Sequence, residues 1–225
     1  MKILWITRAS PGAEATAARL RSLGYEPLVA PVLEVRRLPA TIDLAAVAAL
    51  AFTSANGVRA FAALCDERDR PVFAVGAATA EAARAAGFAA VQSADGDVDA
   101  LVRNLATVQL AGPVLHPGAT EPAGHLVRDL ARLGVTARAV TVYETVAAAL
   151  PAGFLDGLAG FDGVLVYSPR AGRRLAELLR HTAAPNLRAY CLSPEVAATL
   201  RGLAIGPLIA APLPNEDALL SLIVG

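Results

Sequence analysis

Short apolar runs alternate with segments of helical periodicity along the whole chain. Lys2–Thr7 is an apolar run that predicts a strand, and Pro11–Leu23 carries alanine and leucine at helical spacing. Gly24 ends this predicted helix, and Tyr25–Val32 is the next predicted strand. Strand–helix–strand alternation of this length predicts parallel sheets with helices on both faces, because strands buried on both sides are continuously apolar.

The second half of the chain repeats this pattern. Gly24 and Gly134 each end a predicted helix, and they lie 110 positions apart. Three pairs of blocks occur in the same order at nearly one offset: Lys2–Val32 with Pro113–Tyr143, Leu50–Phe61 with Val164–Leu175, and Val72–Gly87 with Ala189–Ala204. A repeated order of this kind indicates a duplication, and it predicts two flavodoxin-like α/β domains.

Composition narrows the classes of function. Of the 225 residues, 55% are apolar and 18% are charged, which favours a folded globular protein over a disordered one. The 20 basic residues balance the 20 acidic ones, so neither a nucleic acid nor a membrane surface is an expected partner. No apolar run reaches the ~18 residues of a membrane span, and the start of the chain is too short in apolar length for a signal peptide. We therefore expect a soluble, cytoplasmic protein.

Metal, disulfide and nucleotide sites have no support in the sequence. Cys65 and Cys191 lack a C-x-x-C spacing, so they are expected to be buried thiols in a reducing compartment. The three histidines stand singly and match no ligand pattern, so no metal site is expected. No glycine-rich nucleotide motif occurs, and no nucleophile elbow surrounds Ser54 or Ser168, which disfavours a hydrolase triad.

Four predicted strands turn directly into helices through loops of small and capping residues. In open α/β sheets, ligands bind at the carboxyl ends of the strands, where these loops lie. A helix start offers unpaired N–H groups and partial positive charge, and it therefore binds anions without a charged side chain. The loops are Thr53–Gly57, Gly76–Thr79, Tyr167–Arg170 and Ser193–Glu195. Together they predict a polyanion site in a crevice between the two domains, with ordinary helix capping as the alternative for any single loop.

Three further side chains are candidates for this site. Arg8 follows the first predicted strand and would point into the same crevice, and Arg188 would lie nearby. The alternative for each arginine is a solvated position on the surface. Tyr143 ends a predicted strand on the second crossing between the domains, where its hydroxyl could reach the crevice; the alternative is a packed ring.

Five short motifs resemble the uroporphyrinogen-III synthase family in their order and spacing, across nearly the whole chain. They are the strand that ends at Arg8, the strand end at Thr53-Ser54, the stretch Val75–Ala80, the strand around Tyr143, and Tyr167-Ser168-Pro169. The resemblance implies two HemD-like α/β domains with parallel sheets, joined by a two-stranded linker.

The domain boundaries follow from the same resemblance. In that family the first strand–helix–strand unit belongs with the C-terminal half of the chain, which would explain the interlaced repeat. We therefore expect one domain from residues 1–33 plus 148–225 and a second from residues 38–142. Residues 34–37 and 143–147 are expected to form the linker.

The resemblance also implies an activity that needs no cofactor. The family cyclises hydroxymethylbilane to uroporphyrinogen III and inverts the terminal pyrrole ring, ring D, through a spirocyclic intermediate. A tyrosine at the position of Tyr143 is the family's candidate for the proton donor. The candidates for substrate binding are Arg8, Thr53, Ser54, Gly76, Thr79, Ser168, Arg188 and Ser193, with no metal ligand. A monomer that makes transient contact with hydroxymethylbilane synthase, the supplier of the substrate, is a further expectation.

Departures from the family pattern leave other functions open. The C-terminal loop of the family commonly reads Gly-Pro-x-Thr-Ala, whereas this chain begins the loop with Ser193 and has Val196 in place of the threonine. Val196 cannot donate a hydroxyl hydrogen bond, and Glu195 would repel a carboxylate if it faced the crevice. The alternatives are a two-lobed α/β protein that binds small anions and an inactive relative of the synthase.

Overall fold

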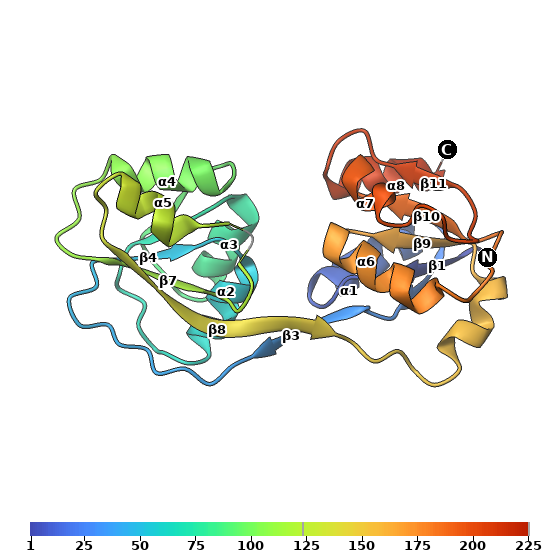
Figure 1. Cartoon of the computed structure of the whole chain (residues 1–225), viewed down its shortest axis with the longest axis horizontal. Helices are drawn as coiled ribbons and strands as arrows, with labels where there is room; N and C mark the ends of the chain where they lie inside the picture. The colour runs from blue at the N-terminus through green and yellow to red at the C-terminus, as the bar shows by residue number, and fades with distance from the viewer. Residues whose placement is uncertain (123, 225) are drawn as a thin grey trace. The chain divides into compact units, whose positions relative to one another are not determined.

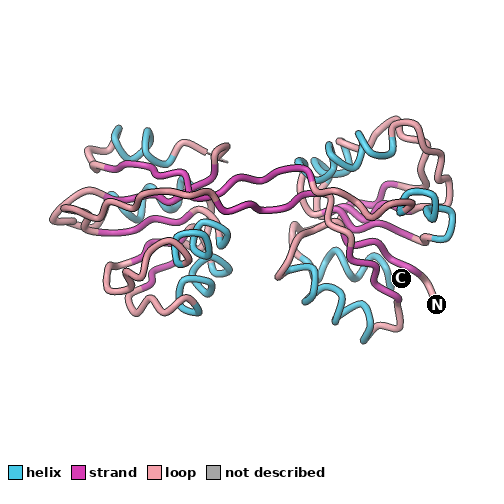
Figure 2. The backbone as a smooth tube through the Cα atoms, turned by 90° about the horizontal axis from the view of Figure 1, so that it is seen from below, coloured by secondary structure: helices cyan, strands magenta, loops and turns pink. Residues whose placement is uncertain are grey.

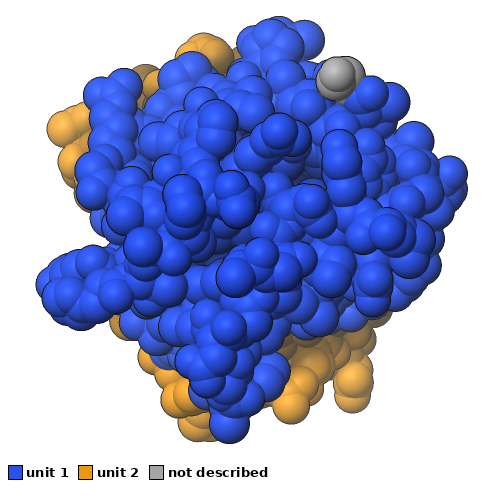
Figure 3. Space-filling model, turned by 90° about the vertical axis from the view of Figure 1, so that its right-hand side faces the viewer, with its two compact units in different colours: residues 1–34, 146–225 blue, residues 35–145 orange. Residues whose placement is uncertain are grey.

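The chain folds into two α/β units. The structure is a computed structural model that describes residues 1–122 and 124–224. Residues 1–34 and 146–225 form unit 1, and residues 35–145 form unit 2 (Figure 1, Figure 3). Unit 1 therefore combines the two ends of the chain, and the chain passes between the units twice.

Unit 1 is built on a five-stranded sheet in the order β11-β10-β9-β1-β2, and its neighbouring strands run parallel. Numbered along the chain within the unit, this order is 2-1-3-4-5, which is that of the flavodoxin-like fold. Its elements are β1 (Ile3–Ile6), α1 (Gly12–Ser22), β2 (Glu26–Val29), a 3₁₀ helix (Phe154–Gly160), β9 (Gly163–Val166), α6 (Pro169–Leu179), β10 (Arg188–Cys191), α7 (Pro194–Ala198), β11 (Leu208–Ala210) and α8 (Glu216–Val224).

Unit 2 has a six-stranded sheet in the order β3-β8-β7-β4-β5-β6. The strands β8, β7, β4, β5 and β6 pair in parallel. Its elements are β3 (Leu33–Arg37), β4 (Ala49–Phe52), α2 (Ala55–Ala62), β5 (Val72–Ala74), α3 (Ala77–Ala85), β6 (Val91–Ser93), α4 (Val98–Ala106), β7 (Val114–Ala119), α5 (Leu126–Arg132) and β8 (Ala137–Ala147). The neighbouring strands β3 and β8 contain the two points where the chain passes from one unit to the other. The α/β fold class with mainly parallel sheets, predicted from the sequence, is confirmed.

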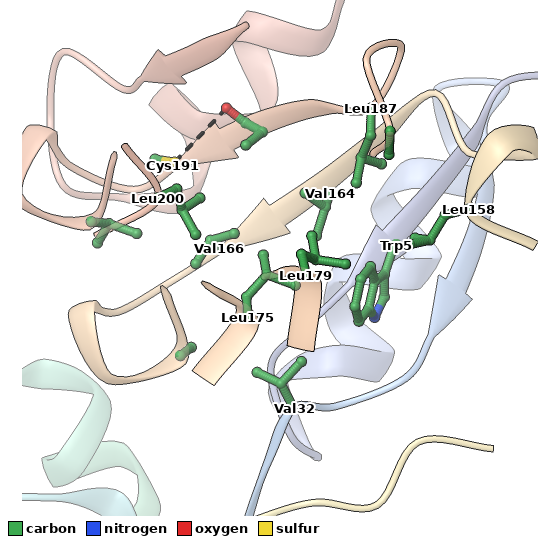
Figure 4. Packing of buried hydrophobic residues seen from close by; sticks show 14 of the residues in the cluster. Trp5, Val32, Leu158, Val164, Val166, Leu175, Leu179, Leu187, Cys191 and Leu200 are labelled. Carbon is green, nitrogen blue, oxygen red and sulfur yellow. Dashed lines mark hydrogen bonds between the residues drawn. The ribbon is translucent and has the colours of Figure 1, made fainter. Parts of the chain in front are cut away.

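Helices cover both faces of the unit 1 sheet, because its strands are apolar on both sides (Figure 2). Trp5 and Val164 belong to the core on one face, where they pack with Leu175 of α6 (Figure 4). Leu4 and Leu165, their neighbours along the strands, belong to the core on the other face under α1 and α8. The alternation of adjacent residues between the two cores is the two-residue period of a strand.

Unit 2 follows the same plan. Leu50 and Phe52 of β4 pack under α2 and α3, where Phe52 makes an edge contact with Phe61 at a ring-centre distance of 5.8 Å. Ala51, between them, faces α4 and α5 and packs with Leu101. Each sheet is therefore a buried layer, and the loops at its strand ends are the parts left for a ligand.

The two sheets share one strand order. Strands β4, β5 and β6 occupy the places of β9, β10 and β11, and strands β7 and β8 occupy the places of β1 and β2. Each sheet has two central strands from which the later strands are added toward opposite edges. In unit 1, β2 lies beside β1, while β10 and β11 follow on the side of β9; in unit 2, β8 lies beside β7, while β5 and β6 follow on the side of β4. These central pairs are topological switch points, where open α/β sheets bind ligands beyond the carboxyl ends of their strands.

Strand β8 is longer than predicted. It runs through Ala147, so the prediction that Tyr143 ends this strand is wrong, and Tyr143 lies inside it. The pairing with β7 shifts after Gly118, and Ala119 then lies opposite Tyr143. On its other side β8 is joined to the chain after β3, since the Leu38 N–H donates to the Val142 carbonyl at 2.9 Å. Such long-range pairing keeps the backbone extended, and local sequence does not reveal it.

Candidate functional site

Arg8 and Ser168 lie at the topological switch point of unit 1. Arg8 follows β1 and Ser168 follows β9, and these parallel neighbours place Ile6 opposite Leu165. Because the carboxyl ends of parallel neighbours meet at one edge of the sheet, the two residues share the edge where a ligand is expected. The structure thus brings together two of the residues that the sequence assigned to the site.

Three neighbours fix the side chain of Arg8. Its Nη1 donates to Oε1 of Glu216 at 3.3 Å, and its guanidinium carbon lies 4.5 Å from the centre of the Tyr167 ring. Gly12 leaves room for the guanidinium, since a Cβ at that position would overlap its atoms. The Arg8 side chain remains 35% exposed, so it is a positioned cation that an anion can still reach.

Glu216 is the centre of a polar cluster that the sequence did not predict. It lies in the first turn of α8, and its carboxylate accepts hydrogen bonds from the hydroxyls of Thr16 and Tyr167 and from Arg19. The Tyr167 hydroxyl is 3.3 Å from Oε1 of Glu216, and Arg19 Nη1 is 3.1 Å from Oε2. Burial, together with the neighbouring Glu216 carboxylate, raises the pKa of Tyr167 to about 12, so this phenol keeps its proton.

Ser168 and Ser193 cap the helices that follow them. Ser168 Oγ accepts from the Ala171 N–H at 3.2 Å, and Ser193 Oγ accepts from the Val196 N–H at 3.3 Å. A proline follows each serine at the first helical position, as is usual for helix starts. Capping therefore occurs at both loops, and it leaves the other N–H groups of each first turn without an intrahelical partner.

Replacing Ser168 by Ala is expected to lower the free energy of unfolding by about 1 kcal/mol, because the Ala171 N–H loses its acceptor. Denaturant unfolding followed by circular dichroism measures the change. Ser221→Ala is the matched control, since the exposed Ser221 hydroxyl donates to the Ala218 carbonyl inside α8 and caps no helix start. An equal loss in both variants would contradict the capping role of Ser168.

Val196 and Glu195, which depart from the family pattern in the loop after β10, have different surroundings. Val196 is buried in the core of unit 1, so its side chain packs and does not face a ligand. Glu195 is exposed in the first turn of α7, where a carboxylate is favoured by the helix dipole. Val196 is thus explained by packing within unit 1.

The carboxyl edge of unit 2 carries two helix starts. Thr53 and Ser54 follow β4, and Ser54 Oγ accepts from the Asn56 N–H at 3.1 Å. Gly76 follows β5 and begins α3 without a side-chain cap, while Thr79 in its first turn has only a small exposed fraction. Strands β4 and β5 are parallel neighbours, so both loops lie at the same edge. The sequence-based candidates of unit 2 are therefore close to one another along that edge.

Tyr143 lies beside the first turn of α2. It is 7% exposed and packs with Val142 and Ala60. Its ring carbon Cε1 is 3.7 Å from the point that a Cβ on Gly57 would occupy, and its backbone carbonyl accepts from the Thr120 N–H at 3.0 Å. Tyr143 therefore contacts the helix that follows β4 and the loop that follows β7, at the switch point of unit 2.

Arg188 lies at the opposite edge of the unit 1 sheet. It is the first residue of β10 and pairs with Gly163, the first residue of β9. The prediction that Arg188 lies near the other candidates is wrong, because the loops with those candidates follow the carboxyl ends of strands, whereas Arg188 is the first residue of β10.

His116 of β7 is a buried polar residue that the sequence did not assign to the site. Its Nδ1 is 2.8 Å from the carbonyl oxygen of Ala51, so Nδ1 carries the hydrogen and donates it. Burial lowers the pKa of His116, which keeps the imidazole neutral. With Pro122 and Leu126 it lines a pocket of about 380 Å³.

Neither a cluster of metal ligands nor a membrane-spanning helix occurs in the part of the chain that the structure describes. Among residues 1–122 and 124–224, no group of three or more histidine, cysteine, aspartate or glutamate side chains could hold a metal ion. Within the same ranges, no helix is long and apolar enough to cross a membrane.

The fold and the residues at the carboxyl edges of its two sheets define the class of this protein. It is a two-unit α/β protein of flavodoxin-like sheets, in which helix starts and a positioned arginine lie at the topological switch points. A family model described as uroporphyrinogen-III synthase HemD matches residues 14–221, and the chain belongs to this family. Its activity is accordingly that of a cyclising lyase in porphyrin and heme biosynthesis.

Solved structures show the same fold. The chain is similar to a uroporphyrinogen-III synthetase from Helicobacter pylori, with 19% identity, a TM-score of 0.69, and coverage of 100% of this chain and 99% of that chain. It is also similar to a mutant uroporphyrinogen III synthase from the extremely thermophilic bacterium Thermus thermophilus, with 19% identity, a TM-score of 0.56, and coverage of 99% and 97%. A search of curated protein sequences found no match.

Proposed function

We propose that the protein converts hydroxymethylbilane to uroporphyrinogen III with inversion of ring D through a spirocyclic intermediate. The observation that carries this proposal is the position of Arg8, a fixed and accessible guanidinium at the switch point of unit 1. A guanidinium binds a carboxylate strongly, through two parallel hydrogen bonds. The substrate carries an acetate and a propionate on every pyrrole, so it offers many such carboxylates.

The reaction can be written without a cofactor. The hydroxymethyl oxygen takes up a proton and leaves as water, while the pyrrole nitrogen supplies the electron pair that forms an azafulvene. The substituted carbon of ring D attacks the new methylene carbon and gives the spirocyclic pyrrolenine. The bond between the substituted carbon of ring D and the methylene that originally linked it to ring C then breaks. The free carbon on the other side of ring D attacks this methylene and loses its proton, so ring D ends in the inverted orientation. The protein has to fold the substrate so that the substituted carbon attacks, which is a task of proximity and orientation.

The candidate residues take two roles in this proposal. Tyr143 donates the proton to the departing hydroxymethyl oxygen. The carboxyl edges bind substrate carboxylates through helix starts and through one arginine. The binding residues are Arg8, Ser168 and Ser193 in unit 1 and Thr53, Ser54, Gly76 and Thr79 in unit 2.

Replacing Arg8 by Ala is expected to weaken binding of the product, uroporphyrinogen III, by about tenfold at low ionic strength, because a charge-assisted contact is lost. The loss should shrink as salt is added, since salt screens an exposed cation. Fluorescence or calorimetric titration at two ionic strengths measures both effects. Arg188→Ala is the control, because it removes the same charge at the opposite edge of the sheet. Unchanged affinity of Arg8→Ala at low ionic strength would remove Arg8 from the site.

A further inference from the structure

The contacts of Arg8 leave one side of its guanidinium available. Nη1 is held by Glu216, and neither Nε nor Nη2 has a hydrogen-bond partner among the described residues. Nε and Nη2 point in the same direction on one side of the planar group, so together they form a fork that matches the two oxygens of a carboxylate. Arg8 is thus hydrogen-bonded at one nitrogen, while the other two have no hydrogen-bond partner among the described residues.

The plane of the guanidinium is also restricted. A Cβ at Gly12 would lie at nearly the same short distance from Nη2, the central carbon and Nε of Arg8, which places the Gly12 backbone against the face of the group. The Tyr167 ring lies 4.5 Å from the guanidinium carbon. These contacts limit tilting, while the Glu216 carboxylate limits rotation within the plane. A ligand that reaches the fork therefore meets an arginine that is already oriented.

Glu216 is itself held in place by residues from two other parts of unit 1. Thr16 and Arg19 come from α1, Tyr167 follows β9, and Glu216 begins α8. Arg19 also forms an ion pair with Asp217, the residue after Glu216, with 2.5 Å between Nη2 and Oδ1. The Glu216 side chain is 24% exposed, compared with 86% for Asp217, so the two neighbouring acids differ in their surroundings. Only Glu216 of this acidic pair contacts Arg8.

We propose that Glu216 is a positioning residue, which orients Arg8 so that its Nε and Nη2 bind one carboxylate of the substrate. The inference rests on the proposed function, in which Arg8 binds a substrate carboxylate. Without the Glu216 carboxylate, a long and flexible side chain has to be ordered at the moment of binding, and this costs affinity. Glu216 touches no substrate atom in this proposal and acts through Arg8 alone.

The hydrogen bonds of this cluster disfavour two other roles for it. Tyr167 is no candidate for the proton donor, since its hydroxyl is directed to Glu216 and Thr16 and burial raises its pKa to about 12. Glu216 could instead compete with the substrate for Arg8. It bonds to Nη1, however, and not to Nε or Nη2, so a carboxylate bound at those two nitrogens does not have to displace it.

The test is a double-mutant cycle with Glu216→Gln and Arg8→Ala. Glu216→Gln keeps the size of the side chain and an acceptor oxygen but removes the charge. We expect it to raise KM for hydroxymethylbilane, and Kd for uroporphyrinogen III, by about three- to tenfold, with kcat little changed. In the Arg8→Ala background the same substitution should have no further effect, because its target is gone. Asp217→Asn is the matched control and should leave KM and Kd unchanged, since Asp217 contacts Arg19 and not Arg8.

The possible outcomes distinguish a failure of this inference from a failure of the proposed function. If Glu216→Gln weakens binding equally with and without Arg8, Glu216 acts on the fold or on the substrate directly, and the inference is wrong. A tighter Kd in Glu216→Gln would show competition with the ligand and would also overturn it. Melting temperatures of all variants identify a loss caused by unfolding. If the wild-type chain binds uroporphyrinogen III but forms none from hydroxymethylbilane, the proposed function fails while the cycle measured as Kd still decides on Glu216.

Discussion

Replacing Tyr143 by Phe is expected to slow formation of the type III isomer by about 100-fold, the lower end of what a general acid contributes. A phenol is protonated at neutral pH and can donate its proton to a departing oxygen, whereas a phenyl ring cannot. The effect should stay at this lower end, because the helix starts and Arg8 still fold the substrate and the azafulvene also forms unaided. Single-turnover rates with separation of the porphyrin isomers measure it.

The setting of Tyr143 makes this substitution informative. Its ring packs with Val142 and Ala60, and these contacts are retained by phenylalanine, so the melting temperature should stay close to that of the wild type. Tyr25→Phe is the matched control, since the Tyr25 hydroxyl donates to the Ile223 carbonyl within unit 1 and has no place in the reaction. Full activity in a folded Tyr143→Phe protein would make Tyr143 a packed strand residue only.

Replacing Gly57 by Ala is expected to lower the free energy of unfolding by about 1–3 kcal/mol. A Cβ there would come within 2.7 Å of the Pro117 carbonyl oxygen, which belongs to β7 and cannot turn aside as a flexible side chain can. The first turn of α2 would have to move away from β7, and with it Ser54 and the contact with Tyr143. Type III formation should therefore fall together with stability.

Denaturant unfolding and the isomer assay measure the two effects of Gly57→Ala. Asn56→Ala is the control, because the Asn56 side chain is bonded to Arg59 on the exposed side of α2. A Gly57→Ala protein with the stability and activity of Asn56→Ala would contradict the close approach of α2 to β7.

Local chemistry made much of the architecture predictable. Apolar runs such as Val164–Val166 are strands because both of their faces are buried, and Ser54, Ser168 and Ser193 were predicted to start helices because their hydroxyls accept from N–H groups two or three residues later. The repeat then predicted two sheets of one kind, and the shared strand order agrees with it. The strand and helix predictions depend on residues close together in the chain, and the repeat compares short blocks of this kind.

Contacts between distant residues were not predictable in the same way. Arg8 and Glu216 are 208 positions apart, and the acidic start of α8 reads as ordinary helix-dipole chemistry until the fold brings it to β1. Tyr143 was predicted to end a strand, whereas β8 stays extended to Ala147. The prediction for Arg188 was wrong because this residue lies at the amino end of β10. It is therefore at the edge of the sheet opposite to the loops that carry the other candidates.

The isomer ratio produced from hydroxymethylbilane tests the central claim most directly. Hydroxymethylbilane synthase supplies the substrate in the presence of the purified protein, and the products are oxidised and separated as type I and type III porphyrins. The account predicts that type III predominates in proportion to the protein added, while the blank without it yields type I from unaided closure. Type I alone, at the rate of the blank and with a folded protein, would contradict synthase activity and would favour an anion-binding protein or an inactive relative of the family.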